Sequence, residues 1–345
     1  MSPEITSLRE EHHQKAANLV RAHCEALREP VPLGSIPTEC RHPVGPTQLP
    51  KGDLMATQAV GYKAKAFEPR NLAFFFLLAF GLSWVLNNAP QIFGLLNIPS
   101  GIESAGPVAI LRTYGPVILL ITVGAWGPTI AAFVMTAMTE GRLGVKALWR
   151  RFWNRNLSIK WLLVTLLVLP ALLLVANFVS RTLDGQAYPF LDLANQPWMV
   201  IPVIPQFIVA FIFNGMTEEF GWRGYALPRF QARWNALTSS IVLGAIWASW
   251  HIPLWFVPGH PLSQRNFWEW ALGMILLTII MTWIFNNTKG SVLAAVLFHA
   301  MINTGIVWCC GSVWHYYGVE LFAVILIVII FGARNLVRQR PEEGT

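Results

Sequence analysis

The sequence predicts an all-α protein, a polytopic membrane helical bundle of about eight transmembrane helices. Of its 345 residues, 54% are hydrophobic and only 12% are charged, against a charged share of about 25% in soluble domains. The mean hydropathy is +0.48. From residue 72 onward, apolar segments recur that are long enough to cross a hydrocarbon core of about 30 Å.

The first 70 residues differ in composition from the rest, because they are polar and rich in proline. We expect residues 1–70 to form a cytosolic N-terminal tail that is partly disordered, with one short amphipathic helix near 7–28. The transmembrane bundle follows over residues 71–335, and residues 336–345 form a short cytosolic tail. The predicted spans lie near residues 72–96, 116–138, 160–180, 199–222, 238–257, 268–286, 290–309 and 318–333.

The distribution of basic residues predicts the orientation of the bundle. Basic residues precede the first span and follow the second, fourth and eighth, whereas the alternate loops hold only Arg112, Arg181 and Arg265. This bias places both termini in the cytoplasm. The formal net charge of +7 is best explained by basic loops beside anionic lipid, so we expect a lipid bilayer as partner and no nucleic acid. The protein is then an integral, multi-pass membrane protein, in the plasma membrane if the source is bacterial.

Three polar interruptions of apolar segments form the candidate site. In the first, Glu218 and Glu219 project about 100° apart on a helix, so they serve different roles. Glu219 and Arg223 are four residues apart and can pair on one face, which leaves Glu218 facing elsewhere. Because a buried carboxylate can take a proton from water, we interpret Glu218 as a general base and Glu219 with Arg223 as its structural brace.

The second interruption is His251, which follows Trp247 by one helical turn and precedes Pro253. Pro253 should kink the helix, and a neutral imidazole at His251 can orient a water molecule or bind a metal. The third is His299 with Asn303, which are four residues apart and face the same way. Their N–H groups suit an oxyanion, although polar pairs of this kind also join helices in membranes.

These three motifs resemble the CPBP intramembrane proteases, a family that includes the type II CAAX prenyl endopeptidases and the Abi bacteriocin-processing and immunity proteins. The pattern reads here as Glu218-Glu219-x-x-x-Arg223, Trp247-x-x-x-His251 and His299-x-x-x-Asn303, within a core at about 199–309. Trp247 departs from the phenylalanine that is more frequent in the family, which raises the question of cavity size. The resemblance implies that Glu218 and His251 activate water and that His299 and Asn303 form an oxyanion hole.

The implied reaction is hydrolysis of a peptide bond in a membrane-associated or lipidated substrate, which includes prenylated CAAX ends. The three motifs lie at depths that agree within about 6 Å when measured from the basic loops, which suggests that substrate enters from the cytosolic side. No cofactor is required by this chemistry, but Glu218, His251 and His299 could instead hold zinc with one open position. Two other functions remain open: a non-catalytic immunity or scaffold protein, and a proton-coupled transporter that uses the carboxylates.

Overall fold

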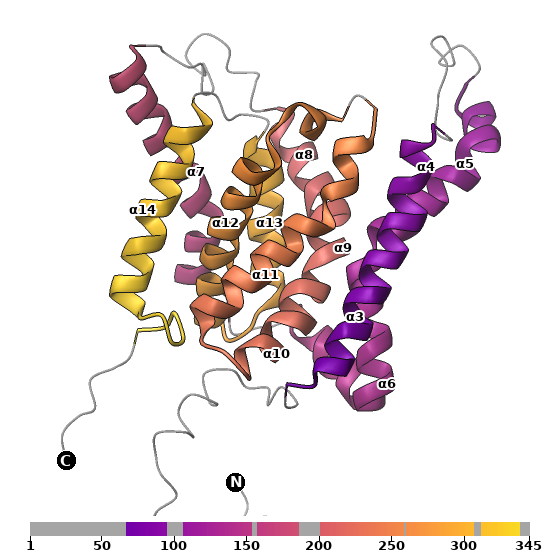
Figure 1. The fold of residues 1–345 in the computed structure, drawn as a ribbon, viewed down its shortest axis with the longest axis horizontal. Helices are drawn as coiled ribbons and strands as arrows, with labels where there is room; N and C mark the ends of the chain where they lie inside the picture. The colour runs from indigo at the N-terminus through magenta and orange to yellow at the C-terminus, as the bar shows by residue number, and fades with distance from the viewer. Residues whose placement is uncertain are drawn as a thin grey trace, which may run out of the picture. The chain divides into compact units, whose positions relative to one another are not determined.

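A computed structural model describes residues 67–94, 106–153, 157–185, 201–258, 260–306 and 312–338 (Figure 1). Within these ranges the regular structure is entirely helical, and no strand is present. The chain divides into two units, Met1–Leu54 and Met55–Thr345, and all described residues belong to the second. The predicted helix near 7–28 lies outside the described residues, and the cytosolic tails stay predictions.

The first span runs through α3 (Pro69–Leu82), a π-helical segment (Ser83–Asn88) and α4 (Ala89–Ile92). The predicted span over 116–138 is not one straight helix. This region belongs to two helices, α5 (Gly106–Ala125) and α6 (Gly127–Arg150), which meet at a bend of 59°. Pro128 cannot continue the hydrogen-bond ladder, and the Ser83 hydroxyl of the first span donates to the Gly124 carbonyl at 2.8 Å. The missing N–H of Pro128 and the hydrogen bond from Ser83 to the Gly124 carbonyl together interrupt the helix at the bend.

The remaining helices follow the predicted order. α7 (Ile159–Asp184) ends at Gly185, whose φ of 67° suits a helix C-terminus. The fourth span is one continuous helical run of five pieces: α8 (Val203–Ala210), a π segment (Phe211–Gly215), α9 (Met216–Glu219), a π segment (Phe220–Ala226) and α10 (Leu227–Gln231). α11 (Ala236–Trp250), α12 (Phe267–Asn287), α13 (Val292–Ile306) and α14 (Val313–Phe331) complete the bundle.

Among the described residues, five helices are long and apolar enough to cross a membrane, or six if the bent α5–α6 pair counts as one span. The predicted fourth and seventh spans are present as helices but do not meet this test of length and hydropathy. The fourth span carries glutamates and arginines, and Val292–Gly305 of α13 is short. The all-α membrane bundle predicted from composition is therefore confirmed, whereas the orientation of its termini stays a prediction.

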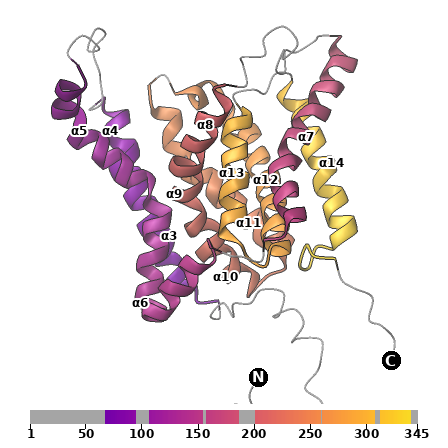
Figure 2. The same ribbon diagram turned by 180° about the vertical axis from the view of Figure 1, so that it is seen from behind.

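The two ends of the bundle differ in charge. At one end, which we call the basic end, α6 finishes, α11 and α13 begin and α14 finishes. Hydrogen bonds join these pieces: Val292 N–H donates to the Arg151 carbonyl at 3.0 Å, and Ala236 N–H to the Arg334 carbonyl at 2.8 Å. The opposite end, which we call the far end, holds the connection from α11 to α12 and the start of α14. In Figures 1 and 2, α10 lies at the lower, basic end.

Two of the basic residues that predicted the orientation are not solvated loop charges. Arg229 is buried and pairs with Glu140 of α6 at 2.6 Å, while its guanidinium carbon lies 3.5 Å from the centre of the Tyr225 ring. Arg151 donates to the carbonyls of Gly224 at 2.7 Å and Gly290 at 3.2 Å. Both arginines thus connect α6 to the segment that carries the two glutamates. Sequence alone could not separate them from exposed loop arginines.

Candidate active site

The first motif lies on α9 and on the π-helical segments that flank it. A π turn is wider than an α turn and is frequent at functional sites. Every residue from Thr217 to Phe230 is buried, including Glu218, Glu219 and Arg223. Ionisable groups at this depth are costly unless they are paired, so the partners of each carboxylate indicate what it does.

Glu219 joins two helices of the bundle. Its Oε1 atom accepts one hydrogen bond from Arg223 Nη1 at 2.9 Å and one from His299 Nδ1 at 2.7 Å. The close approach of α13 depends on Gly215, because a Cβ atom there would lie 2.8 Å from the Val296 side chain and carbonyl oxygen. The predicted Glu219–Arg223 pair is present. His299 belongs to the same network, which the sequence did not indicate.

Glu218 faces away from this pair and is held by two indoles. Its Oε2 atom accepts a hydrogen bond from Trp247 Nε1 at 2.7 Å and another from Trp222 Nε1 at 3.1 Å. No side chain or backbone group within the described ranges donates to its other oxygen, Oε1. The neutral donors fix the orientation of the carboxylate without cancelling its charge. Oε1 remains free to accept a proton.

Trp247 is the residue that connects the three motifs. Its ring lies 5.3 Å from the His299 ring and 5.9 Å from the His251 ring, measured between centroids. The guanidinium carbon of Arg223 lies 4.4 Å from the centre of the same indole, within cation–π range. The indole N–H bonds to Glu218, which a phenylalanine could not do. The sequence reading, which considered only cavity size at this position, therefore missed its main contact.

His251 caps the end of α11. Pro253 ends this helix rather than kinking it, and a short 3₁₀ helix (Ile252–Phe256) follows. The His251 Nδ1 atom lies 2.8 Å from the Trp247 carbonyl oxygen, which can only accept a hydrogen bond. Nδ1 therefore carries the proton, and Nε2 has a free lone pair. The Trp247 indole contacts His251, His299 and Glu218, so the three ionisable groups surround one ring.

Asn303 lies one turn beyond His299 on α13. Its Nδ2 atom donates to the His299 carbonyl oxygen at 3.2 Å. Both side chains line the same cavity, as the i, i+4 spacing predicted. The carboxamide hydrogen not used in this bond is the one that would be available to a ligand.

The cavity itself has a volume of about 180 Å³ and is walled by α7, α11, α12, α13 and α14. Trp247, His251, His299 and Asn303 line it, together with Arg265, Trp270, Tyr316 and Tyr317. The last four, which we call the outer residues, lie where α12 and α14 begin, at the far end of the bundle. The side from which substrate enters stays a prediction.

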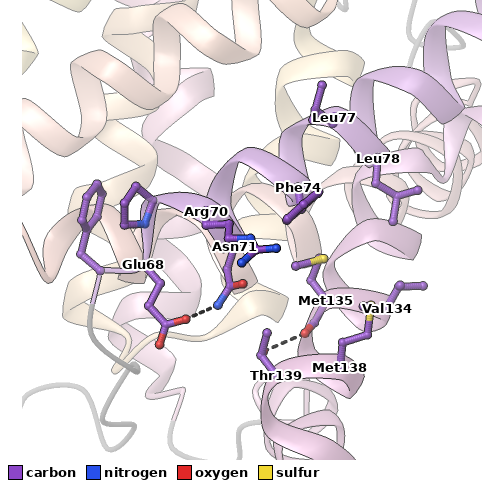
Figure 3. Close-up of a pocket in the computed structure, with 12 residues that line it drawn as sticks. Glu68, Arg70, Asn71, Phe74, Leu77, Leu78, Val134, Met135, Met138 and Thr139 are labelled. Carbon is purple, nitrogen blue, oxygen red and sulfur yellow. Dashed lines mark hydrogen bonds between the residues drawn. The ribbon is translucent and has the colours of Figure 1, made fainter.

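A larger cavity of about 970 Å³ lies between α3 and α6, and it contains none of the candidate residues (Figure 3). Apolar side chains such as Phe74, Leu77 and Met138 line it, with the hydrogen-bonded pair Asn71 and Glu68 at one edge. Choosing the larger cavity would therefore miss all of the candidate residues.

The alternative zinc site does not fit this geometry. Across the described part of the chain, no three His, Cys, Asp or Glu side chains are grouped as a metal centre would require. The hydrogen bonds of Glu218 and His299 do not decide this point, because they leave Glu218 Oε1 and His299 Nε2 unused. The zinc alternative fails on the grouping of the side chains.

Comparison with known proteins agrees with this arrangement. Residues 200–305, which contain every candidate residue, match the family model of the type II CAAX prenyl endopeptidase Rce1-like proteins. This match supports the resemblance of the chain to the Rce1-like CPBP family. The chain is also 28% identical over 201 residues to CAAX prenyl protease 2 of Methanococcus maripaludis, an alignment that covers 55% of this chain and 73% of that protein. Together with the apolar helices, the two matches support an integral membrane peptidase.

Three residues of the site, Trp222, Trp270 and Arg265, were not found from the sequence. Trp222 donates to Glu218 and follows it by four residues, so the i, i+4 rule applied to Glu219 and Arg223 would also have found this pair. The outer residues Trp270 and Arg265 carried no such signal, because their place in the cavity depends on how α12 packs against α11.

Proposed function

We propose that this protein is an endopeptidase that cleaves a membrane-associated substrate near a lipidated end, of the prenylated CAAX type that the archaeal relative is named for. Glu218 acts as the general base and His251 orients the attacking water. His299 and Asn303 stabilise the oxyanion, and Glu219, Arg223 and Trp247 hold these groups in place. The observation that carries the proposal is the pair of indole hydrogen bonds that orient Glu218 while leaving Oε1 free.

The reaction proceeds in two steps. A water molecule bound between Glu218 Oε1 and His251 Nε2 gives its proton to Glu218 as its oxygen attacks the peptide carbonyl. The resulting oxyanion is held by donors on α13. The C–N bond then breaks, and Glu218 returns the proton to the departing amine. This leaves two peptides and regenerates the carboxylate.

The charges around His299 support its role as a donor to the oxyanion. Its Nδ1 proton goes to Glu219, so a donor at Nε2 requires the imidazolium form. In that form His299 and the buried Glu219 carboxylate are an ion pair, with Nδ1 and Oε1 2.7 Å apart.

The test is cleavage of a farnesylated peptide by the purified protein in lipid nanodiscs. Glu218→Gln keeps the size of the side chain and removes the base, so cleavage should fall by a factor of about 10²–10⁴. Glu68→Gln is the matched control, because Glu68 is an exposed residue outside the cavity. If Glu218→Gln cleaves as fast as the wild type, the base is another group and the proposed mechanism is wrong.

A further inference from the structure

The first span is not a regular α-helix where it passes the end of α11. Its π-helical segment (Ser83–Asn88) contains Trp84, whose Nε1 atom donates to the Trp250 carbonyl oxygen at 2.9 Å. This bond joins residues 166 apart in the sequence, and it ends on the peptide group next to His251. A π turn is frequent at functional sites, and the proposed chemistry does not use this one.

The Trp250 carbonyl takes a donor from another helix because of Pro253. In a helix this carbonyl would accept from the N–H three or four residues later. Pro253 has no N–H, and the Leu254 N–H donates instead to the His251 carbonyl at 2.9 Å. The indole of Trp84 therefore satisfies a backbone group that the end of α11 leaves over.

Ser83, the neighbour of Trp84, does the same for another proline. In a continuous helix the Gly124 carbonyl would accept from residue 128, but Pro128 has no N–H, and the Ser83 hydroxyl donates to this carbonyl at 2.8 Å. A Cβ atom at Gly127 would meet the same hydroxyl, so glycine permits the contact. Two consecutive side chains of one π segment thus bind carbonyls that two prolines leave over, one at the α5–α6 bend and one at the end of α11.

The π segment is fixed by its contacts with α5. Ser83 is fully buried, and Asn87 Nδ2 donates to the Ile121 carbonyl at 3.1 Å. A Cβ atom at Gly124 would meet the Asn87 backbone nitrogen, so the segment packs directly on α5. Trp84 is 38% exposed and extends from this fixed base to α11.

The orientation of His251 depends on the peptide group that Trp84 holds. His251 is the C-cap of α11, and its Nδ1 atom lies 2.8 Å from the Trp247 carbonyl oxygen. Its ring lies 4.7 Å from the Trp250 ring and 5.0 Å from the Trp270 ring, measured between centroids. Rotation of the peptide group between Trp250 and His251 would turn the imidazole and move Nε2, the atom that faces the attacking water in the proposed mechanism.

We propose that Trp84, held by the anchored π segment, is a positioning residue for His251. This inference rests on the proposed function, in which His251 orients the attacking water. The first span lies outside residues 200–305, which match the family model, and it then contributes to the reaction without touching substrate. Because a displacement of about 1 Å in a catalytic group can cost a factor of about 100 in rate, one hydrogen bond beside His251 is enough to affect turnover.

The first measurement is steady-state cleavage of a farnesylated peptide in lipid nanodiscs. Trp84→Phe keeps a ring beside Phe80 but removes the N–H, so kcat should fall by about 10- to 100-fold while KM stays within about twofold. Adding Trp84→Phe to His251→Ala should change the residual kcat by less than about twofold, because the side chain that Trp84 positions is then absent.

Trp268→Phe is the matched control. Trp268 is 78% exposed at the same end of the bundle, its ring lies 5.1 Å from the Phe267 ring, and its indole forms no hydrogen bond within the described ranges. This variant loses the same ring volume and an N–H without a partner, so it should keep the wild-type kcat.

The second measurement does not depend on cleavage. It follows the imidazole nitrogen resonances of His251 by NMR in isotope-labelled protein, with the assignment made from their loss in His251→Gln. Trp84→Phe should shift these resonances, and Trp268→Phe should leave them in place.

Unchanged His251 resonances in Trp84→Phe would overturn the inference, whatever the rate of cleavage. It would also be overturned by a wild-type kcat in Trp84→Phe when His251→Ala is impaired, or by an equal loss of kcat in the presence and absence of His251, since Trp84 would then act on the fold. If the resonances shift but His251→Ala cleaves as fast as the wild type, the positioning contact stands and the proposed role of His251 in the reaction is wrong.

Discussion

Replacing Trp247 by phenylalanine tests the central contact of the site. The change keeps an aromatic ring beside His299 and beneath Arg223, but it removes the N–H that donates to Glu218 at 2.7 Å. A hydrogen bond to a charged acceptor is worth about 1.5–3 kcal/mol. Trp222 still donates to the same oxygen, so the carboxylate keeps one partner and can rotate about it.

The expected result has two parts. The free energy of unfolding should fall by about 1.5–3 kcal/mol for the lost bond, with about 1 kcal/mol more for the smaller ring. Turnover should fall by about 10- to 100-fold if the bond is needed to aim Glu218, since 1.4 kcal/mol corresponds to a factor of ten. The two quantities are measured by denaturant unfolding and by cleavage of a farnesylated peptide in nanodiscs.

Trp283→Phe is the matched control, because Trp283 Nε1 is buried without a hydrogen-bond partner in the described structure. It loses the same ring volume but no hydrogen bond, and it lies on α12 away from the cavity lining. The difference between the two variants isolates the bond to Glu218. Equal losses of stability in both, with wild-type turnover in Trp247→Phe, would refute the reasoning.

Four further outcomes follow from the same contacts. Glu140→Gln leaves Arg229 buried and unpaired and should lower unfolding stability by about 3–5 kcal/mol, whereas exposed Arg142→Gln should change it by less than about 0.5 kcal/mol. A Cβ atom at position 215 would lie 2.8 Å from Val296, and Gly215→Val adds two methyl groups beyond it. The free energy of unfolding should fall by about 1–3 kcal/mol, and cleavage should fall more than in Gly215→Ala. Chelators should change cleavage by less than about twofold, and a tenfold loss reversed by zinc would contradict the site described above. Ser263→Cys should react with an impermeant maleimide from outside intact cells, and Arg338→Cys only after permeabilisation; the reverse pattern would invert the orientation inferred from loop charges.

Much of the fold could be predicted because membrane helices are encoded in long stretches of composition. Seven of the eight predicted spans correspond to helical runs at nearly the predicted residues. The remaining one, at 116–138, is bent for a local reason. The bend between α5 and α6 depends on Pro128 and on a hydroxyl from another helix, Ser83, which hydropathy does not detect.

The site was predictable where partners lie one turn apart and not where they lie on different helices. Glu219 with Arg223 followed from i, i+4 spacing, and so could Glu218 with Trp222. The bonds from Trp247 to Glu218 and from His299 to Glu219 cross between helices. Their existence depends on close packing at positions such as Gly215, which a single sequence does not show.

The two adjacent glutamates have opposite environments for a geometric reason. Because neighbouring residues on a helix point about 100° apart, Glu219 faces α13 and the cation Arg223, while Glu218 faces the indoles. Cationic partners neutralise a carboxylate, and this makes Glu219 a structural link between helices. Neutral N–H donors solvate a carboxylate but leave its charge, so Glu218 keeps the capacity to accept a proton. In the proposed mechanism, consecutive glutamates therefore supply a structural brace and a base, because two tryptophans contact Glu218 where a second arginine would neutralise its charge.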